Sequence, residues 1–328
     1  MKIKKLLSAA SAAVLTAALS VSFSGCGTTD NSSGTNAKYT VGICQLTQHE
    51  ALDAATEGFR AALEEKLGDD VEFNFQNASG ETTNCTTITN QFVSSGVDLI
   101  MANGTAALQS AATATGDIPI LATSITDYPT ALDISDWTGK TGRNISGTSD
   151  LAPLDQQAAM LTELFPEAKK VGILYCSAEA NSKYQSTEIT KYLKESGLEV
   201  SEYTFADSND ITSVVTTACG EVDVIYIPTD NKAADNTEII NSVASDKKIP
   251  IIAGEEGICK GCGVATLSIN YYDIGYKTGE MAYEILVNGA DPADMEVELS
   301  KDLTKKYVKD RAEALNVTIP DGYTAISE

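Results

Sequence analysis

Polar side chains follow the short apolar runs of this sequence at the points where each run ends. In open α/β sheets, ligands bind outside the carboxyl ends of the strands, where loops lead into helices. Helix N-termini there offer unpaired N–H groups and a positive dipole end, which suit a carboxylate. The residues predicted to face such a site are Gln45, His49, Asn77, Asn103, Gly104, Thr105 and Ser124 in the first half of the chain, and Glu179, Asn181, Ser182, Thr229, Asp230, Asn231 and Glu255 in the second.

The same residues do not form a catalytic set. His49 is the only histidine, and no Ser–His–Asp arrangement or Gly-x-Ser-x-Gly elbow accompanies it. Dinucleotide and Walker phosphate loops are also missing. Cys259-Lys260-Gly261-Cys262 is a single CxxC without a second pair, so a short disulfide or free thiols are favoured over a metal site. The sequence therefore predicts a binding protein that is no enzyme and needs no metal or cofactor.

Charge excludes another class of partner. The 328 residues include 23 Lys and Arg against 46 Asp and Glu, which gives a net charge of −23. A chain this acidic, with no basic stripe, repels phosphate backbones. Nucleic acid is therefore not an expected partner.

The elements that would position these residues occur twice along the chain. Short β-rich runs recur in the same order at separations of 130, 125 and 131 residues, at 41–43 and 171–173, 97–100 and 222–225, and 118–120 and 249–251. Runs of this kind are typical of parallel strands buried on both faces. Amphipathic helix patterns lie between them, and Thr47 to Glu50 reads as a capping box at the start of one helix. Two doubly wound parallel-sheet α/β lobes are predicted.

The N-terminus has the pattern of an export signal. Three lysines in the first five residues precede an apolar run from Leu6 to Phe23, so residues 1–25 are expected to be a signal peptide. Phe23-Ser24-Gly25-Cys26 resembles a bacterial lipobox, although the pattern prefers Leu where Phe23 stands. We expect lipidation at Cys26 and a polar tether over 26–37, with a plain secretory signal as the alternative.

Further strings make a family resemblance specific. The chain resembles the ABC-transporter substrate-binding lipoproteins of the tryptophan/tyrosine type over about Tyr39 to Pro320, through 42–53 with 57–59, 103–107, 144–150, 177–182, 227–231 and 253–255. The resemblance implies a type I periplasmic-binding-protein fold whose two lobes are joined by a multi-strand hinge. The expected lobes are 38–147 with about 268–298, and 148–267 with about 299–328.

The resemblance also implies a function. We expect a monomer that is exported and lipid-anchored at the outer face of the cytoplasmic membrane. It would capture a small amino acid, aromatic by preference, and deliver it to a permease and its ATPase. The alternative is a surface lipoprotein that senses or binds another small ligand, such as a branched-chain amino acid, a nucleoside or a peptide, without transport.

A captured amino acid needs donors for its carboxylate and acidic acceptors for its ammonium group. We expect Thr105 with neighbouring backbone N–H groups to hold the carboxylate, and Asp230, alone or with Glu179, to hold the ammonium group. Each residue has a structural alternative, because Asp, Thr and Asn also cap helices. Gln45 is expected to point into the cleft, and Tyr128 and Tyr272 are candidates either to stack on an aromatic ring or simply to pack.

Overall fold

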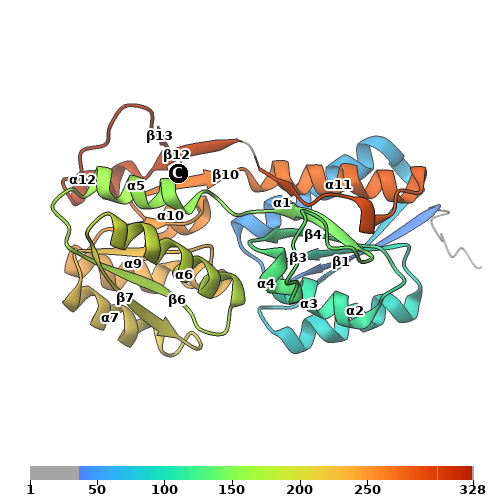
Figure 1. Ribbon diagram of the computed structural model, residues 1–328, viewed down its shortest axis with the longest axis horizontal. Helices are drawn as coiled ribbons and strands as arrows, with labels where there is room; N and C mark the ends of the chain where they lie inside the picture. Colours follow the sequence, from blue (N-terminus) through green and yellow to red (C-terminus); the bar gives the residue numbers. More distant parts are fainter. Residues whose placement is uncertain (1–36, 301, 327–328) are drawn as a thin grey trace, which may run out of the picture. The chain divides into compact units, whose positions relative to one another are not determined.

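The computed structural model describes residues 37–300 and 302–326, so the predicted signal peptide, Cys26 and nearly all of the tether lie outside the described residues. The first lobe is built on a parallel sheet in the order β11-β5-β4-β3-β1-β2. Figure 1 labels β4, β3 and β1 of this sheet. Its strands are β1 (Tyr39–Gln45), β2 (Val71–Asn77), β3 (Leu99–Asn103), β4 (Ile120–Ile125), β5 (Ile145–Ser149) and β11 (Glu298–Leu299). Its helices are α1 (Glu50–Leu67), α2 (Thr82–Ser95), α3 (Thr105–Ala114), α4 (Tyr128–Leu132) and α11 (Tyr271–Asn288), with short 3-10 turns at Gly68–Asp70 and Pro292–Asp294.

The second lobe has the strand order β13-β12-β10-β9-β8-β6-β7. All its neighbouring strands are parallel except β10 and β12, which are antiparallel. Its strands are β6 (Lys170–Cys176), β7 (Glu199–Phe205), β8 (Val224–Ile227), β9 (Ile251–Ala253), β10 (Ala265–Ile269), β12 (Leu303–Tyr307) and β13 (Thr324–Ala325). Its helices are α5 (Leu154–Leu164), α6 (Ala180–Glu195), α7 (Ile211–Glu221), α8 (Asn231–Ala234), α9 (Thr237–Lys247), α10 (Glu256–Cys262) and α12 (Lys309–Ala314).

The predicted repeat is present in the strand pairing. Val41 of β1 pairs with Leu99 of β3, and Val171 of β6 pairs with Val224 of β8. The first strand of each repeat, β1 or β6, carries a glycine that faces an aromatic ring: a Cβ on Gly42 would lie 2.7 Å from the Phe92 ring. A Cβ on Gly172 would lie 2.9 Å from the ring of Tyr203. The predicted fold class, two parallel-sheet α/β lobes, is confirmed.

The chain passes between the sheets three times: after β5, after β10 and between β11 and β12. The sequence-based boundaries at 147/148 and 267/268 divide β5 and β10, whereas the structure keeps β5 whole in the first sheet and β10 whole in the second. The difference has a simple cause, because a strand stays in one sheet for as long as its backbone groups are paired there.

The predicted capping box is wrong. His49 is the N-cap residue of α1, and its side chain makes no capping hydrogen bond. The Thr47 hydroxyl instead donates to Asp235 Oδ2 of the second lobe at 2.9 Å. Thr47 therefore bonds to a residue of the other lobe instead of capping the first turn of α1.

Helices α1 and α11 pack with their backbones in close approach. A Cβ on Gly58 would lie 2.1 Å from the carbonyl oxygen of Tyr272, and one on Gly275 would lie 1.9 Å from that of Ala55. Only glycine allows this spacing. The contact fixes the first turn of α1, which follows His49, beside that of α11, which begins with Tyr271.

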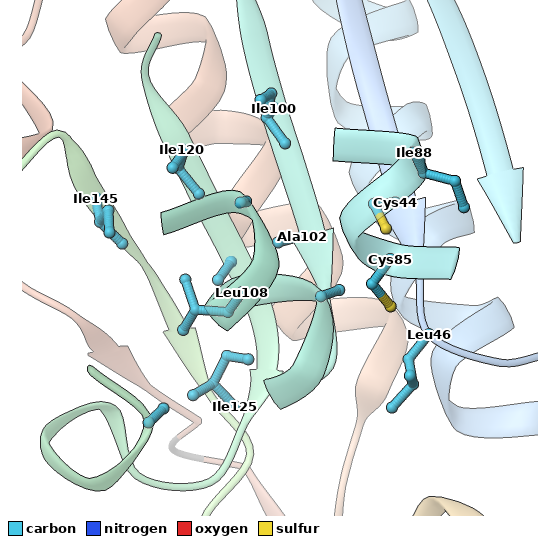
Figure 2. Close-up of a cluster of buried hydrophobic side chains, with 14 of the residues drawn as sticks. Cys44, Leu46, Cys85, Ile88, Ile100, Ala102, Leu108, Ile120, Ile125 and Ile145 are labelled. Carbon is cyan, nitrogen blue, oxygen red and sulfur yellow. The ribbon is translucent and has the colours of Figure 1, made fainter. Parts of the chain in front are cut away.

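The described cysteines are all buried and free. Cys44 of β1 and Cys85 of α2 lie in one apolar cluster of the first lobe, shown in Figure 2. Cys259 and Cys262 lie in a cluster of the second lobe, so the CxxC serves as core packing rather than as a disulfide. Within residues 37–300 and 302–326, no helix is both long and apolar enough to cross a bilayer.

Candidate ligand-binding site

A cavity lies between the two lobes where the carboxyl ends of their strands meet. We call it the inner cavity. Its volume is about 20 Å³, which holds one or two water molecules. The lobes are therefore closed on one another, and an organic ligand can enter the inner cavity only when they separate. The inner cavity is lined by His49, Leu52, Ser124, Thr126, Asp150, Asn181, Thr229, Asp230, Asn231, Ala234, Glu255, Ile258 and Tyr271.

A larger cavity of about 370 Å³ shares Asn181 with the inner one, and we call it the outer cavity. Helices α2, α3 and α6 begin at its wall, and Lys232 is the one cation among the described residues that line it. Its lining residues are Leu46, Gly80, Glu81, Thr82, Thr83, Thr105, Ala106, Gln109, Cys176, Ala178, Glu179, Ala180, Asn181, Ala206, Asp207 and Lys232.

Ser124, near the end of β4, has the clearest sign of an absent partner. Its hydroxyl is buried in the inner-cavity wall and makes no hydrogen bond within the part of the chain that the structure describes. Its φ of 56° places a serine in the left-handed region, which is costly for a residue other than glycine. A buried hydroxyl without a partner is unfavourable, so both features are typical of a site completed by a ligand.

Asp150 follows β5 at the first crossing between the lobes. Its Oδ1 accepts a hydrogen bond from the Thr126 hydroxyl at 3.0 Å, and its Oδ2 accepts one from the Tyr271 hydroxyl at 2.9 Å. Burial raises the pKa of this carboxyl above its ordinary value, although these hydrogen bonds oppose the shift.

The acids of the second lobe are bonded to backbone N–H groups. Asp230 is the N-cap of α8, with Oδ1 accepting from Ala233 N at 2.7 Å and Oδ2 from Cys176 N at 2.7 Å. Burial, with a smaller contribution from the charge of Glu179, raises the pKa of Asp230 to about 7. Glu179 accepts from the backbone N–H groups of Asn231 and Lys232 at 3.1 and 2.9 Å.

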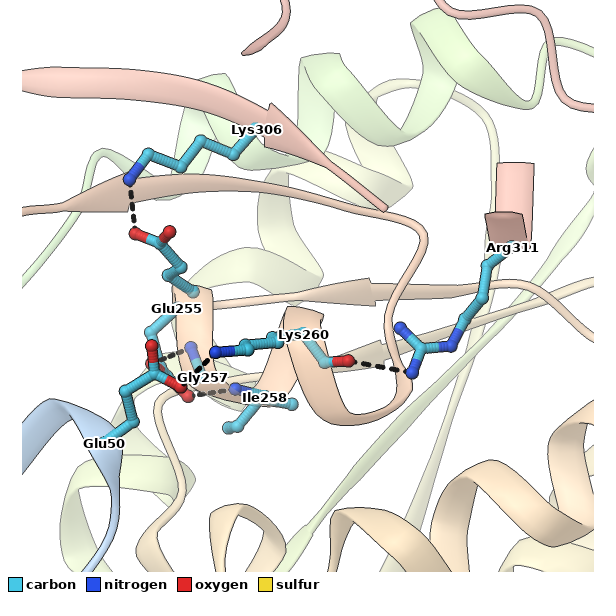
Figure 3. A network of polar contacts seen from close by, with 8 residues as sticks. Glu50, Glu255, Gly257, Ile258, Lys260, Lys306 and Arg311 are labelled. Atoms are coloured by element: carbon cyan, nitrogen blue, oxygen red, sulfur yellow. Dashed lines mark hydrogen bonds and ion pairs between the residues drawn. The ribbon is translucent and has the colours of Figure 1, made fainter. Parts of the chain in front are cut away.

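Glu255 has a comparable capping role at α10. Its carboxylate accepts from the backbone N–H groups of Gly257 and Ile258, as Figure 3 shows. At the other end of this helix, Arg311 donates to the carbonyl oxygens of residues 259, 260, 261 and 263. Both ends of α10 are thus fixed, and Glu255 is held against the cavity.

Hydrogen bonds join the two lobes around the inner cavity. His49 Nε2 lies 3.1 Å from Asn231 Oδ1, and Thr126 Oγ1 lies 3.4 Å from Thr229 Oγ1. Toward solvent, Lys260 and Glu50 form an exposed ion pair at 3.5 Å. Opening of the lobes must break these contacts.

About half of the predicted site residues lie in the wall of the inner cavity: His49, Ser124, Asn181, Thr229, Asp230, Asn231 and Glu255. Thr105 and Glu179 line the outer cavity together with Asn181. Five lie in neither wall, namely Gln45, Asn77, Asn103, Gly104 and Ser182.

Those five residues have structural partners. Gln45 does not point into the cleft: it is fully buried, donates to Thr47 O and Asp53 Oδ1, and accepts from Thr56. Asn103 donates to Leu52 O and to the Thr56 hydroxyl. Asn77 accepts from Ser79 N, Gly104 is the N-cap of α3, and Ser182 bonds with Asn181 and Asp230.

The aromatic residue at the cavity is a different tyrosine from those expected. Tyr128 is buried and donates to the carbonyl oxygens of Ala122 and Thr148, and Tyr272 stacks on Tyr276. Tyr271, next to Tyr272, lines the inner cavity. Sequence reasoning also missed Thr126 and Asp150, although each directly follows a buried strand and the strand-end rule would have found them.

Comparison with known proteins agrees with this geometry. A family model described as ABC transporter substrate binding protein matches residues 40–326. A Tyrosine-binding protein of Clostridioides difficile (strain R20291) is 38% identical over 296 residues, which cover 87% of this chain and 85% of that protein.

Two solved structures bear on the conformation. An ABC domain from Streptococcus pneumoniae in complex with L-Trp matches with a TM-score of 0.84 and 32% identity, over 88% of this chain and 100% of that one. The ligand-free, open structure of a substrate-binding protein with adhesive properties from Clostridium difficile matches with a TM-score of 0.68 and 37% identity, over 88% of this chain and 99% of that one. The arrangement of lobes here is closer to the complex, although the open protein has the higher identity.

The family model spans nearly all the described residues, and the relatives are matched along most of their length. The matched structures have the same two-lobed fold. The chain belongs to the family of ABC transporter substrate-binding proteins.

Proposed function

We propose that this protein captures an aromatic amino acid (tyrosine, tryptophan or phenylalanine) between its lobes and delivers it to the permease of an ABC importer. The observation that carries the proposal is the unpartnered Ser124 hydroxyl in a cavity between the two lobes. The names of the relatives, one tyrosine-binding and one in complex with L-Trp, support an aromatic ligand.

The cleft offers partners for both charges of an amino acid. Ser124 and the N-terminus of α3 at Thr105 supply donors for a carboxylate. The acids of the inner cavity supply acceptors for an ammonium group. The outer cavity, at about 370 Å³, falls within the range of small-molecule sites and is large enough for a ring.

Capture requires movement of the lobes. In the closed arrangement the inner cavity has space only for water, so the ligand must enter an open form and then be enclosed. The three crossings between the sheets provide the hinge. Contacts such as that between His49 and Asn231 then re-form over the ligand.

We further propose that the protein is a monomer, anchored outside the cytoplasmic membrane by a lipid on Cys26. Substrate-binding proteins of ABC importers act outside the cytoplasm, which fits the export pattern of residues 1–25. The anchor would keep the protein near the permease.

The test is calorimetry and thermal unfolding of the purified exported protein with the twenty amino acids, the common nucleosides and a set of short peptides. An aromatic amino acid at 100 times its Kd is expected to stabilise the fold by about 2.7 kcal/mol. If only branched-chain amino acids, nucleosides or peptides stabilise the protein, the aromatic assignment is wrong. If no small molecule does so, capture itself is wrong.

Ser124→Gly sharpens this test. Glycine removes the hydroxyl and also relieves the left-handed backbone, so the free energy of unfolding should change by no more than about 1 kcal/mol. Ligand affinity should nevertheless fall by about 10-fold or more. The matched control is Ser94→Gly, on the exposed face of α2, which should destabilise the helix slightly and leave affinity unchanged.

A further inference from the structure

We infer that Asp150 selects the ligand by binding a primary ammonium group, and that a ligand carboxylate is dispensable. The site would then accept aromatic primary amines as well as aromatic amino acids. This inference rests on the proposed capture of an aromatic ligand between the lobes.

The hydrogen bonds of Asp150 leave it open to a ligand. Its partners in other side chains are the hydroxyl groups of Thr126 and Tyr271, and among the described residues no backbone N–H group of another residue donates to it. Each carboxylate oxygen can accept more than one hydrogen bond. Asp150 is only 5% exposed, forms no ion pair among the described residues and lines the inner cavity. A buried carboxylate of this kind is stabilised by a cation that enters the cavity.

The other acids of the inner cavity, Asp230 and Glu255, already accept hydrogen bonds from backbone N–H groups. Both oxygens of Asp230 accept backbone N–H groups at the start of α8 and the end of β6. Both oxygens of Glu255 accept the N–H groups that open α10. An ammonium group on either residue would share oxygens that fix the start of a helix through backbone N–H groups. On Asp150 it would share them with side-chain hydroxyl groups, which can rotate to make room for it.

The charge of the cleft favours a cation over an anion. Asp150, Asp230 and Glu255 line the inner cavity, while Glu81, Glu179 and Asp207 line the outer one. Among the described residues that line the two cavities, Lys232 is the one cation, His49 is the one histidine and none is an arginine. A ligand's ammonium group therefore gains in this field, and its carboxylate gains little.

The unpartnered Ser124 hydroxyl is an independent sign of a ligand in the same cavity. A serine hydroxyl can accept as well as donate, so it can serve as a second acceptor for the ammonium group when no carboxylate is present. A ligand without a carboxylate thus leaves no buried charge of the protein unpaired.

The test compares three ligands that share one ring: L-tyrosine, tyramine, which lacks the carboxylate, and 3-(4-hydroxyphenyl)propionate, which lacks the ammonium group. Calorimetry on the wild-type protein should give tyramine within about 10-fold of tyrosine. The propionate should bind more than about 10-fold more weakly. Tyramine weaker than tyrosine by more than 10-fold, or the propionate equal to tyrosine, would overturn the inference.

Two variants locate the effect. Asp150→Asn should weaken tyrosine and tyramine together by about 10-fold or more, because the amide removes the charge and keeps the shape. Asp98→Asn is the matched control: Asp98 is an exposed acid before β3 that accepts from Thr40 N, and affinity should not change. Unchanged affinity in Asp150→Asn would overturn the inference while tyrosine binding still supports the proposed function. Failure of all three ligands, together with tryptophan and phenylalanine, would reject the proposed function itself.

Discussion

The two lobes share one strand order, β4-β3-β1-β2 in the first and β9-β8-β6-β7 in the second, but contribute different chemistry to the cleft. Among the described residues, the first lobe presents an unpartnered hydroxyl at Ser124 and a carboxylate at Asp150 whose partners in other side chains are hydroxyl groups. The second presents Asp230 and Glu255, whose oxygens already accept backbone N–H groups. The presence of an acidic residue in a cleft therefore does not show that it binds the ligand. Its existing hydrogen-bond partners decide whether it binds a ligand or caps a helix.

The largest expected effect comes from removing an acid of the second lobe. Asp230→Ala removes the cap of α8 and leaves the N–H of Cys176 without its acceptor. Loss of a cap and of a buried hydrogen bond should cost about 3 kcal/mol in the free energy of unfolding. Urea denaturation measures this loss in the free energy of unfolding. It is done at pH 5, which is below the Asp230 pKa of about 7. Stability within 1 kcal/mol of wild type, combined with lost ligand affinity, would instead make Asp230 the ammonium acceptor.

A second effect is the pH dependence of stability. Burial raises the pKa of Asp230 from its ordinary 3.8 to about 7, so between about pH 4 and 7 the folded protein binds more protons than the unfolded chain. Stability therefore falls as pH rises through this window, by up to about 1.4 kcal/mol per pH unit for this group. Denaturation at several pH values should give a flatter dependence for Asp230→Asn, and an equal slope would contradict the assignment.

The smallest expected effect is at the rim between the lobes. Lys260→Met removes the exposed ion pair with Glu50. Such pairs contribute about 0.5 kcal/mol or less, so ligand affinity should change less than about 3-fold. Calorimetry in low salt is the measurement. A 10-fold loss would mean that the rim, rather than the inner cavity, controls closure.

The fold could be predicted from the sequence because each strand of the repeat is a short apolar run. Such runs and the spacing between them are visible in the local sequence. The site was predicted less well. The strand-end rule placed His49, Ser124 and Asp230 at the cavity but could not show that Gln45 turns inward to Thr56. Which side chains find tertiary partners depends on the other lobe and on α11, and no local pattern encodes that.

Asp150 illustrates the same limit. It stands at the end of a strand, in a string that also contributes to the family resemblance, yet its partner Tyr271 lies 121 residues away. The proximity of the two follows from the close packing of α1 against α11 and from the crossings between the lobes. Only the folded structure reveals it.

The most direct test of the account is a crystal structure of the protein with L-tyrosine. We predict that the ligand is enclosed between the lobes, with its ammonium nitrogen within hydrogen-bond distance of an Asp150 oxygen and a polar group of the ligand within hydrogen-bond distance of the Ser124 hydroxyl. A ligand bound outside this cleft would contradict capture between the lobes, and an ammonium group seated on Asp230 or Glu255 instead would contradict the role assigned to Asp150.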